Sequence, residues 1–182
     1  MSSRKVTGYS PVIKFLHWLI ALAVIMMLIV GFFLEDIPEQ YHAYTIHKST
    51  GITLLFLVIF RFIWIHASGR PPLPDSVKLW EKVLSRFVQY SFYVLLILMP
   101  LSGWIMSVAA GYIPSYFGLF NLPFPGIGLD KPLGDFMSES HTVIAWIIIV
   151  FVVLHIAGAL KHHFIDKDNV LKQMLPGKDK TH

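Results

Sequence analysis

The sequence predicts an all-α integral membrane protein, built as a bundle of four transmembrane helices. Of its 182 residues, 55% are hydrophobic and only 14% are charged, and the mean hydropathy is +0.62. Four apolar stretches each approach the roughly twenty residues that a spanning helix needs. They cover about residues 14–34, 46–65, 86–108 and 141–161. No internal repeat or low-complexity tract interrupts the chain, so residues 1–182 are expected to form one domain.

The segments that flank these stretches, taken in chain order, support the assignment of four helices. The first stretch is predicted to be retained, because it is longer than a signal-peptide core and ends in Gly31-Phe-Phe-Leu-Glu-Asp36, without a small-residue cleavage site. A short acidic turn follows it, and a Pro-rich link over residues 70–75 precedes the third stretch. Pro100 is expected to kink the third helix. A long Gly/Pro/aromatic loop over about 109–138 then leads to the fourth helix, which His141 is expected to open.

Lysine and arginine residues are distributed unevenly between the two sides of this predicted bundle. Of the 15 such residues, all but Lys48 and Lys131 flank the same side of the four stretches. Because positively charged segments remain in the cytoplasm, both termini are predicted to be cytoplasmic. The isoelectric point near 9.3 follows from this asymmetry, so the charge points to the membrane and gives no reason to infer nucleic-acid binding.

Cysteine is absent from the sequence. This excludes disulfides, iron–sulfur clusters held by thiolates, and the Cys-x-x-Cys-His attachment of a covalent haem. Any haem bound by this chain must therefore be held noncovalently.

Four histidines are predicted to lie at two depths within the membrane. His141 and His155 are 14 residues apart, which places them on one helix face with a rise of roughly 21 Å between them. The predicted topology then pairs His47 with His141 near the external face and His17 with His155 near the cytoplasmic face. Each pair joins two different helices, as ligation of one haem iron by two imidazoles requires.

Other interpretations of intramembrane histidines are open. A single such histidine also fits a hydrogen-bonded packing residue or a proton relay, and the set fits a histidine-lined metal or proton transporter. A zinc site would favour tighter clusters with carboxylate or cysteine neighbours, and the four stretches contain no interior Asp or Glu. The matched layers therefore favour two haems. Arg61, the one other ionisable side chain expected to be buried, either extends to the interface or neutralises haem propionates at the cytoplasmic site.

A further histidine lies beyond the predicted cytoplasmic haem. His162 follows His155 by seven residues, so it shares the same helix face and lies about 10 Å further along the axis. This is a suitable depth for the headgroup of a lipid-soluble quinone. The alternative is that His162 and His163 form a rim pair that binds phospholipid headgroups. Three other histidines are expected to be boundary or solvated residues: His42, His66 and His182.

These residues resemble the bacterial cytochrome b561 family of four-helix membrane cytochromes. The matching residues are His17-Trp18, Ile46-His47 with Gly51, Arg61, His141, His155, His162-His163-Phe164, Lys167-Asp168-Asn169, Leu171, Met174 and Pro176. The resemblance implies two b-type haems in a bacterial inner membrane, one of them held by His17 and His155. The other haem is then held by His47 and His141, and ubiquinone binds near His162 at the cytoplasmic face.

One branch of this family oxidises superoxide at the external face and passes the electrons to ubiquinone, so superoxide oxidase activity is the leading expectation. That branch uses a lysine between the second and third helices, for which Lys78 is the nearest candidate. The predicted external segments are acidic overall, with Glu35, Asp36, Glu39, Asp130, Asp135 and Glu139 against Lys48 and Lys131. This acidity favours a second possibility, a quinol-oxidising cytochrome that donates electrons to a basic periplasmic redox protein, such as a dehydrogenase or hydrogenase subunit.

Overall fold

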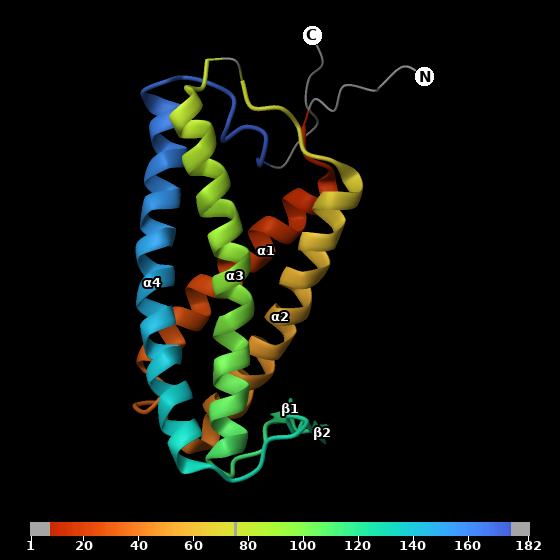
Figure 1. Cartoon of the computed structure of the whole chain (residues 1–182), viewed down its shortest axis with the longest axis vertical. Coiled ribbons are helices and arrows are strands. Elements are labelled where there is room, and N and C mark those ends of the chain that lie inside the picture. The colour runs from red at the N-terminus through yellow and green to blue at the C-terminus, as the bar shows by residue number, and fades with distance from the viewer. Residues whose placement is uncertain (1–7, 75, 176–182) are drawn as a thin grey trace.

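The computed structural model describes residues 8–74 and 76–175 of the chain. Its four long helices are α1 (Pro11–Phe32), α2 (Ala43–Ser68), α3 (Leu79–Ala109) and α4 (Lys131–Phe164). All four are long and apolar enough to cross a membrane, so the predicted all-α bundle of four spanning helices is confirmed (Figure 1). Pro100 lies inside α3, which is helical on both sides of it.

The helices pack in chain order. α1 packs on α2, α2 on α3, and α3 along α4, whereas the backbones of α1 and α4 hardly approach each other. Apolar side chains from all four helices form the core, because residues three or four positions apart line the same face of a helix. The buried members are Leu16, Ile20, Val24, Leu54, Val58, Tyr93 and Ile148.

The bundle has two distinct ends (Figure 1). The link end contains the beginning of α1, the α2–α3 link and the end of α4; the hairpin end contains the α1–α2 turn and the loop between α3 and α4. Among the described basic residues, Lys48 and Lys131 belong to the hairpin end, as the sequence predicted. Several residues used in the sequence argument lie outside the described part: Arg4, Lys5, Asp75, Pro176, Lys178, Lys180 and His182.

The fourth helix begins earlier than the sequence suggested. The side chain of Asp130 caps it by accepting a hydrogen bond from the Leu133 amide at 3.0 Å. A proline follows in the first turn, where its missing N–H costs nothing, and Lys131 pairs with Asp135 at 2.5 Å. The prediction of a loop as far as residue 138 was therefore wrong, and His141 lies well inside α4 instead of opening it.

The loop between α3 and α4 is fixed against the helices. It forms a small antiparallel hairpin in which β1 (Ser115–Tyr116) pairs with β2 (Phe120–Asn121). The fully buried Ser49 hydroxyl accepts a hydrogen bond from the Phe117 amide at 2.8 Å, and the Trp104 indole donates to the Leu122 carbonyl at 2.8 Å. These bonds tie the loop to α2 and α3, so it closes the hairpin end. A short 3-10 helix, η1 (Glu39–Tyr41), lies in the α1–α2 turn.

The segment after α4 returns across the link end. The Trp18 indole of α1 donates a hydrogen bond to the Met174 carbonyl at 2.8 Å. The side-chain amide of Gln173 donates one to the Pro72 carbonyl at 3.2 Å. Lys14, one turn before Trp18, is only 6% exposed. The expectation that Arg61 is the one buried ionisable residue besides histidine was therefore wrong, because Lys14 lies among the buried residues Ile13 and Leu16 at the start of α1.

Candidate functional site

The first histidine pair lies towards the link end and joins α1 to α4, the two helices whose backbones hardly approach each other. His17 of α1 and His155 of α4 have ring centroids 6.1 Å apart, with 61° between the ring planes. Two imidazole nitrogens that bind opposite sides of one metal ion, at about 2.0 Å each, have ring centres roughly 6 Å apart. The separation therefore fits two axial ligands of one iron. His17 is half-buried and His155 is exposed.

Aromatic rings and one arginine surround this pair. The Phe92 ring lies 5.5 Å from the His155 ring. Arg61 is close enough to both histidines to interact with them electrostatically, and its Nη1 donates a hydrogen bond to the Tyr93 hydroxyl at 2.5 Å. The Arg61 Nε is buried and has no hydrogen-bond partner among the described residues. A buried guanidinium with an unused N–H is suited to an anionic group, such as a haem propionate.

The second histidine pair lies towards the hairpin end. His47 of α2 and His141 of α4 both line a cavity of about 1120 Å³ that contacts all four helices. Cavities for small molecules and cofactors are commonly about 300–1,000 Å³, so this one has room for a large flat ligand. The Nδ1 of His47 is buried and has no hydrogen-bond partner among the described residues.

The ring of His141 is oriented by the backbone of α3. Its Nδ1 lies 3.0 Å from the Met99 carbonyl oxygen and 3.0 Å from the Ser102 hydroxyl, which itself donates to the same carbonyl. A carbonyl only accepts, so Nδ1 must carry the proton. In the neutral imidazole, Nε2 is then left unprotonated as a possible metal ligand, an arrangement typical of metal-binding histidines.

Two glycines make room for the rings of this pair. A Cβ atom on Gly103 would lie 3.0 Å from His141 Cε1 and 3.2 Å from its Nδ1, and one on Gly31 would lie 3.3 Å from His47 Cε1. All three distances are shorter than comfortable contacts between nonbonded heavy atoms. By contrast, a Cβ on Gly158 in α4 would meet nothing within 4 Å. Glycine is thus needed beneath the rings of the hairpin-end pair.

The mouth of the hairpin-end cavity is mixed in charge. Lys48, the residue after His47, donates a hydrogen bond to the Ser107 hydroxyl at 2.8 Å and lies 5.8 Å from the centre of the Tyr112 ring. Acidic residues of the lining are Glu35, Asp36, Asp130 and Asp135. The lining also contains Lys131, which pairs with Asp135, so its four carboxylates outnumber its two lysines, one of which is beside His47.

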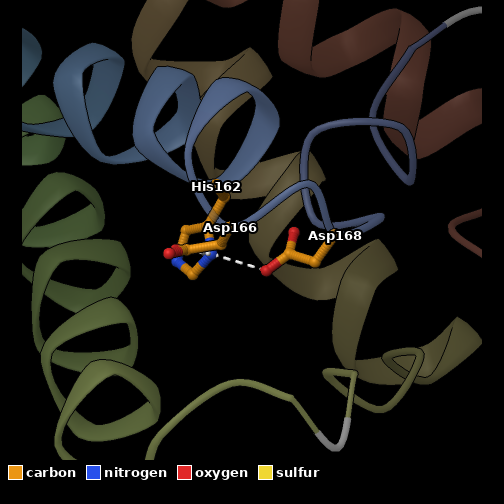
Figure 2. A group of neighbouring side chains, drawn as sticks. All are labelled: His162, Asp166 and Asp168. Carbon is orange, nitrogen blue, oxygen red and sulfur yellow. Dashed lines mark hydrogen bonds and ion pairs between the residues drawn. The ribbon is translucent and has the colours of Figure 1, made fainter.

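The His162 side chain belongs to a charged cluster at the end of α4 (Figure 2). Its Nδ1 lies 2.7 Å from a carboxylate oxygen of Asp168 and 3.2 Å from one of Asp166. Lys161 pairs with Asp166 at 2.6 Å, and this hydrogen bond lowers the pKa of the Asp166 carboxyl. Lys78 also interacts electrostatically with Asp166. Lys78, also predicted for the quinone site, therefore lies near the cluster that contains His162.

Several residues around these sites were not singled out from the sequence. Asp166 follows His162 by four residues, a spacing that places side chains together on a helix and would have predicted their contact. Asp168 was named only as part of the family resemblance, and its contact with His162 was not predicted because Asp168 lies beyond the helix, where no such periodicity applies. Tyr93 and Ser102 contact Arg61 and His141 across helix boundaries, and nothing in their local sequence indicates these partners.

The fold is that of a four-helix membrane protein in which two histidine pairs, each from two helices, lie between the helices. A family model for prokaryotic cytochrome b561 matches residues 8–177, and the chain belongs to that family. It is 36% identical to cytochrome b561 homolog 2 of Escherichia coli (strain K12) over 172 residues, which cover 92% of this chain and 90% of the relative.

Two further relatives differ in what they are named for. A probable superoxide oxidase CybB of Yersinia pestis is 28% identical over 169 residues, covering 90% of this chain and 93% of the relative. A probable Ni/Fe-hydrogenase B-type cytochrome subunit of Rhizobium leguminosarum bv. viciae is 22% identical over 210 residues, covering 93% and 86%. Family membership makes this chain a transmembrane electron-transfer protein, with haem b as the cofactor that the family implies. The oriented His141 ring and the cavity beside it fit that group.

Proposed function

We propose that this protein binds two haem b groups and acts as a superoxide:ubiquinone oxidoreductase. One haem would be held by His47 and His141 and the other by His17 and His155. The observation that carries the proposal is the presence of two histidine pairs, each from two helices, at different levels of one bundle. Haem supplies the one-electron chemistry that amino-acid side chains lack. The chain supplies ligands, spacing and local charge.

The proposed arrangement in the membrane places the link end in the cytoplasm and the hairpin end outside, in the bacterial inner membrane. The support is the distribution of basic residues: in the described part, Lys48 and Lys131 are at the hairpin end and the other lysines belong to the link-end half. Superoxide would then be oxidised at the hairpin end. Lys48 is the cation beside His47, and a fixed positive charge there favours an approaching anion.

Quinone reduction would take place at the link end. Two superoxide ions yield two dioxygen molecules and two electrons, and ubiquinone takes up those electrons with two protons to become ubiquinol. His162 is suited to hydrogen-bond a quinone carbonyl and to pass on a proton, because a neutral imidazole has one nitrogen that donates and one that accepts. Lys78 is the second candidate for contact with the headgroup, since it lies in the same charged environment.

A second function is favoured by the rim of the hairpin-end cavity. Glu35, Asp36, Asp130 and Asp135 make that rim acidic, which repels superoxide and attracts a basic protein surface. The chain would then oxidise quinol at the link end and pass electrons to a periplasmic redox protein. The hydrogenase-type relative is named as a cytochrome subunit of a Ni/Fe-hydrogenase.

The deciding experiment is anaerobic reconstitution of the purified protein with ubiquinone, followed by addition of superoxide while haem and quinone redox states are recorded. Reduction of the haem bands followed by formation of ubiquinol, abolished by superoxide dismutase, supports the proposal. Haem reduction by added ubiquinol, together with no response to superoxide, supports the second function. A protein without haem bands would overturn both and favour a histidine-lined transporter.

A further inference from the structure

Three metal-type donors converge where α4 ends. Among the described residues, His162, Asp166 and Asp168 each offer one ligand atom, and these atoms all lie within 4.8 Å of one another. The two carboxylates approach the same ring nitrogen, at 2.7 Å from Asp168 and 3.2 Å from Asp166. Figure 2 shows the three side chains together, with a dashed line between His162 and Asp168. An imidazole N–H has a single proton, so it cannot satisfy two carboxylates equally well. A cation in place of that proton can bind both.

The backbone explains why the donors converge. α4 ends at Phe164, and Lys167 has a left-handed conformation with φ of 54°, which turns the chain back on the helix end. The Asp168 amide then donates a hydrogen bond to the His162 carbonyl at 3.1 Å. Residues on both sides of this turn consequently face the last turn of the helix.

Neighbouring groups hold the two carboxylates in place. The other oxygen of Asp168 accepts a hydrogen bond from the Val170 amide at 2.9 Å, and the Asp168 side chain is only 5% exposed. Lys161 holds Asp166 at 2.6 Å but also contacts Glu81 at 2.7 Å. If Asp166 turned to a metal ion, the Lys161 ammonium would keep Glu81 as its partner. The cluster thus has supporting contacts of the kind that orient metal ligands.

We propose that His162, Asp166 and Asp168 form an exchangeable binding site for a divalent transition-metal ion of the zinc class. One imidazole nitrogen and two carboxylate oxygens suit such ions, and a water molecule completes the usual four-coordinate geometry. Magnesium and calcium are disfavoured because both prefer an all-oxygen environment. The competing explanation is that the cluster only anchors the chain after α4 through ion pairs.

Metal binding would also regulate the link end, a consequence that rests on the proposed function. An ion on Nδ1 of His162 would replace the proton that the ring is proposed to exchange with the quinone. Zinc should therefore slow quinone reduction and leave the haem spectra unchanged. The binding site itself does not depend on that activity.

The site is tested by zinc titration of the purified protein, prepared with an affinity tag other than polyhistidine and stripped with a chelator. Isothermal titration should give one site per chain in the wild type. His162→Gln and Asp168→Asn should weaken it by about tenfold or more, and His163→Gln, the adjacent histidine outside the cluster, should bind as the wild type does. Lys161→Met should bind zinc more tightly, because Asp166 loses its competing partner.

Equal zinc binding by the wild type and Asp168→Asn would overturn the site, provided that both show the same haem spectrum. Unchanged affinity in Lys161→Met together with unchanged affinity in Asp166→Asn would exclude Asp166 as a ligand and overturn the three-residue site. The quinone reaction is measured separately in metal-free protein, which tests the proposed function alone. If that reaction proceeds and one zinc ion binds without slowing it, the regulatory consequence is wrong.

Discussion

The two histidine pairs lie in contrasting surroundings, although each joins α4 to another helix. At the hairpin end, His141 is held by a backbone carbonyl and a buried serine, and Gly103 leaves no space for a side chain beneath its ring. At the link end, His155 is exposed, and its neighbours are aromatic rings and a buried guanidinium. One site is defined by shape and hydrogen bonds, the other by charge.

This difference determines which substitutions each histidine pair should tolerate. A ring fixed by the backbone and by close packing tolerates few changes in volume, because packed interiors respond to single methyl groups. A ring beside a fixed cation tolerates changes in volume better but responds to changes in charge, since Coulomb interactions are strong where water is scarce. The two sites should therefore fail under different substitutions.

The largest expected effect comes from removing one ligand of either pair. His141→Ala should eliminate the haem at the hairpin end, and His155→Ala the haem at the link end, because alanine provides no atom that can bind iron. Each variant should retain about half of the wild-type haem in a pyridine haemochrome assay. If a single substitution removed both haems from a protein that still inserts into the membrane, the two sites would not be independent.

Gly103→Ala should produce the next largest effect, confined to the hairpin end. The new methyl group would lie 3.0 Å from His141 Cε1, and such overpacking costs about 1–3 kcal/mol. Part of the haem at this site should therefore be lost on heating, as followed by the decrease in Soret absorbance. Gly158→Ala is the matched control, because its methyl group meets nothing within 4 Å. Equal haem loss in the two variants would argue against a close fit beneath His141.

Much of the arrangement was predictable from the sequence, because membrane insertion imposes a simple periodic pattern. Hydropathy identified the four helices, and the spacing of His141 and His155 predicted that these two histidines lie at different levels of the bundle. The limits of the helices were less predictable: α4 begins at Lys131 because the Asp130 cap and an ion pair extend it beyond the apolar stretch. Helical structure outside the membrane leaves no mark in hydropathy.

Contacts between distant parts of the chain were the least predictable features. The hydrogen bond from Trp18 to Met174 joins residues 156 positions apart, and the hydrogen bond from Arg61 to Tyr93 joins residues 32 positions apart. Such contacts depend on how helices rotate and tilt against one another, which hydrophobic pattern alone does not determine.

Arg61→Gln should have a moderate effect, and at the link end alone. Removal of a positive charge near His17 and His155 favours the oxidised iron, so the midpoint potential of that haem should fall by an amount on the order of tens of millivolts, where 59 mV is a tenfold change for a one-electron couple. Spectroelectrochemical titration measures both potentials. Tyr93→Phe, which keeps the ring and the arginine charge, should change the potential less, and the hairpin-end haem should be unaffected by either substitution.

Ser102→Ala should have the smallest effect. The Ser102 hydroxyl contributes one of two hydrogen bonds at His141 Nδ1, and a neutral hydrogen bond is worth about 0.5–1.5 kcal/mol. The Met99 carbonyl remains as an acceptor, so the ring should keep its orientation and the haem should be fully bound. Only a small shift in the midpoint potential of the hairpin-end haem is expected. Ser107→Ala serves as the control, because Ser107 is a buried serine of the same helix that bonds Lys48 instead. A larger potential shift in Ser107→Ala than in Ser102→Ala would mean that Lys48, rather than the hydrogen bonding of His141, governs the electronic properties of the hairpin-end site.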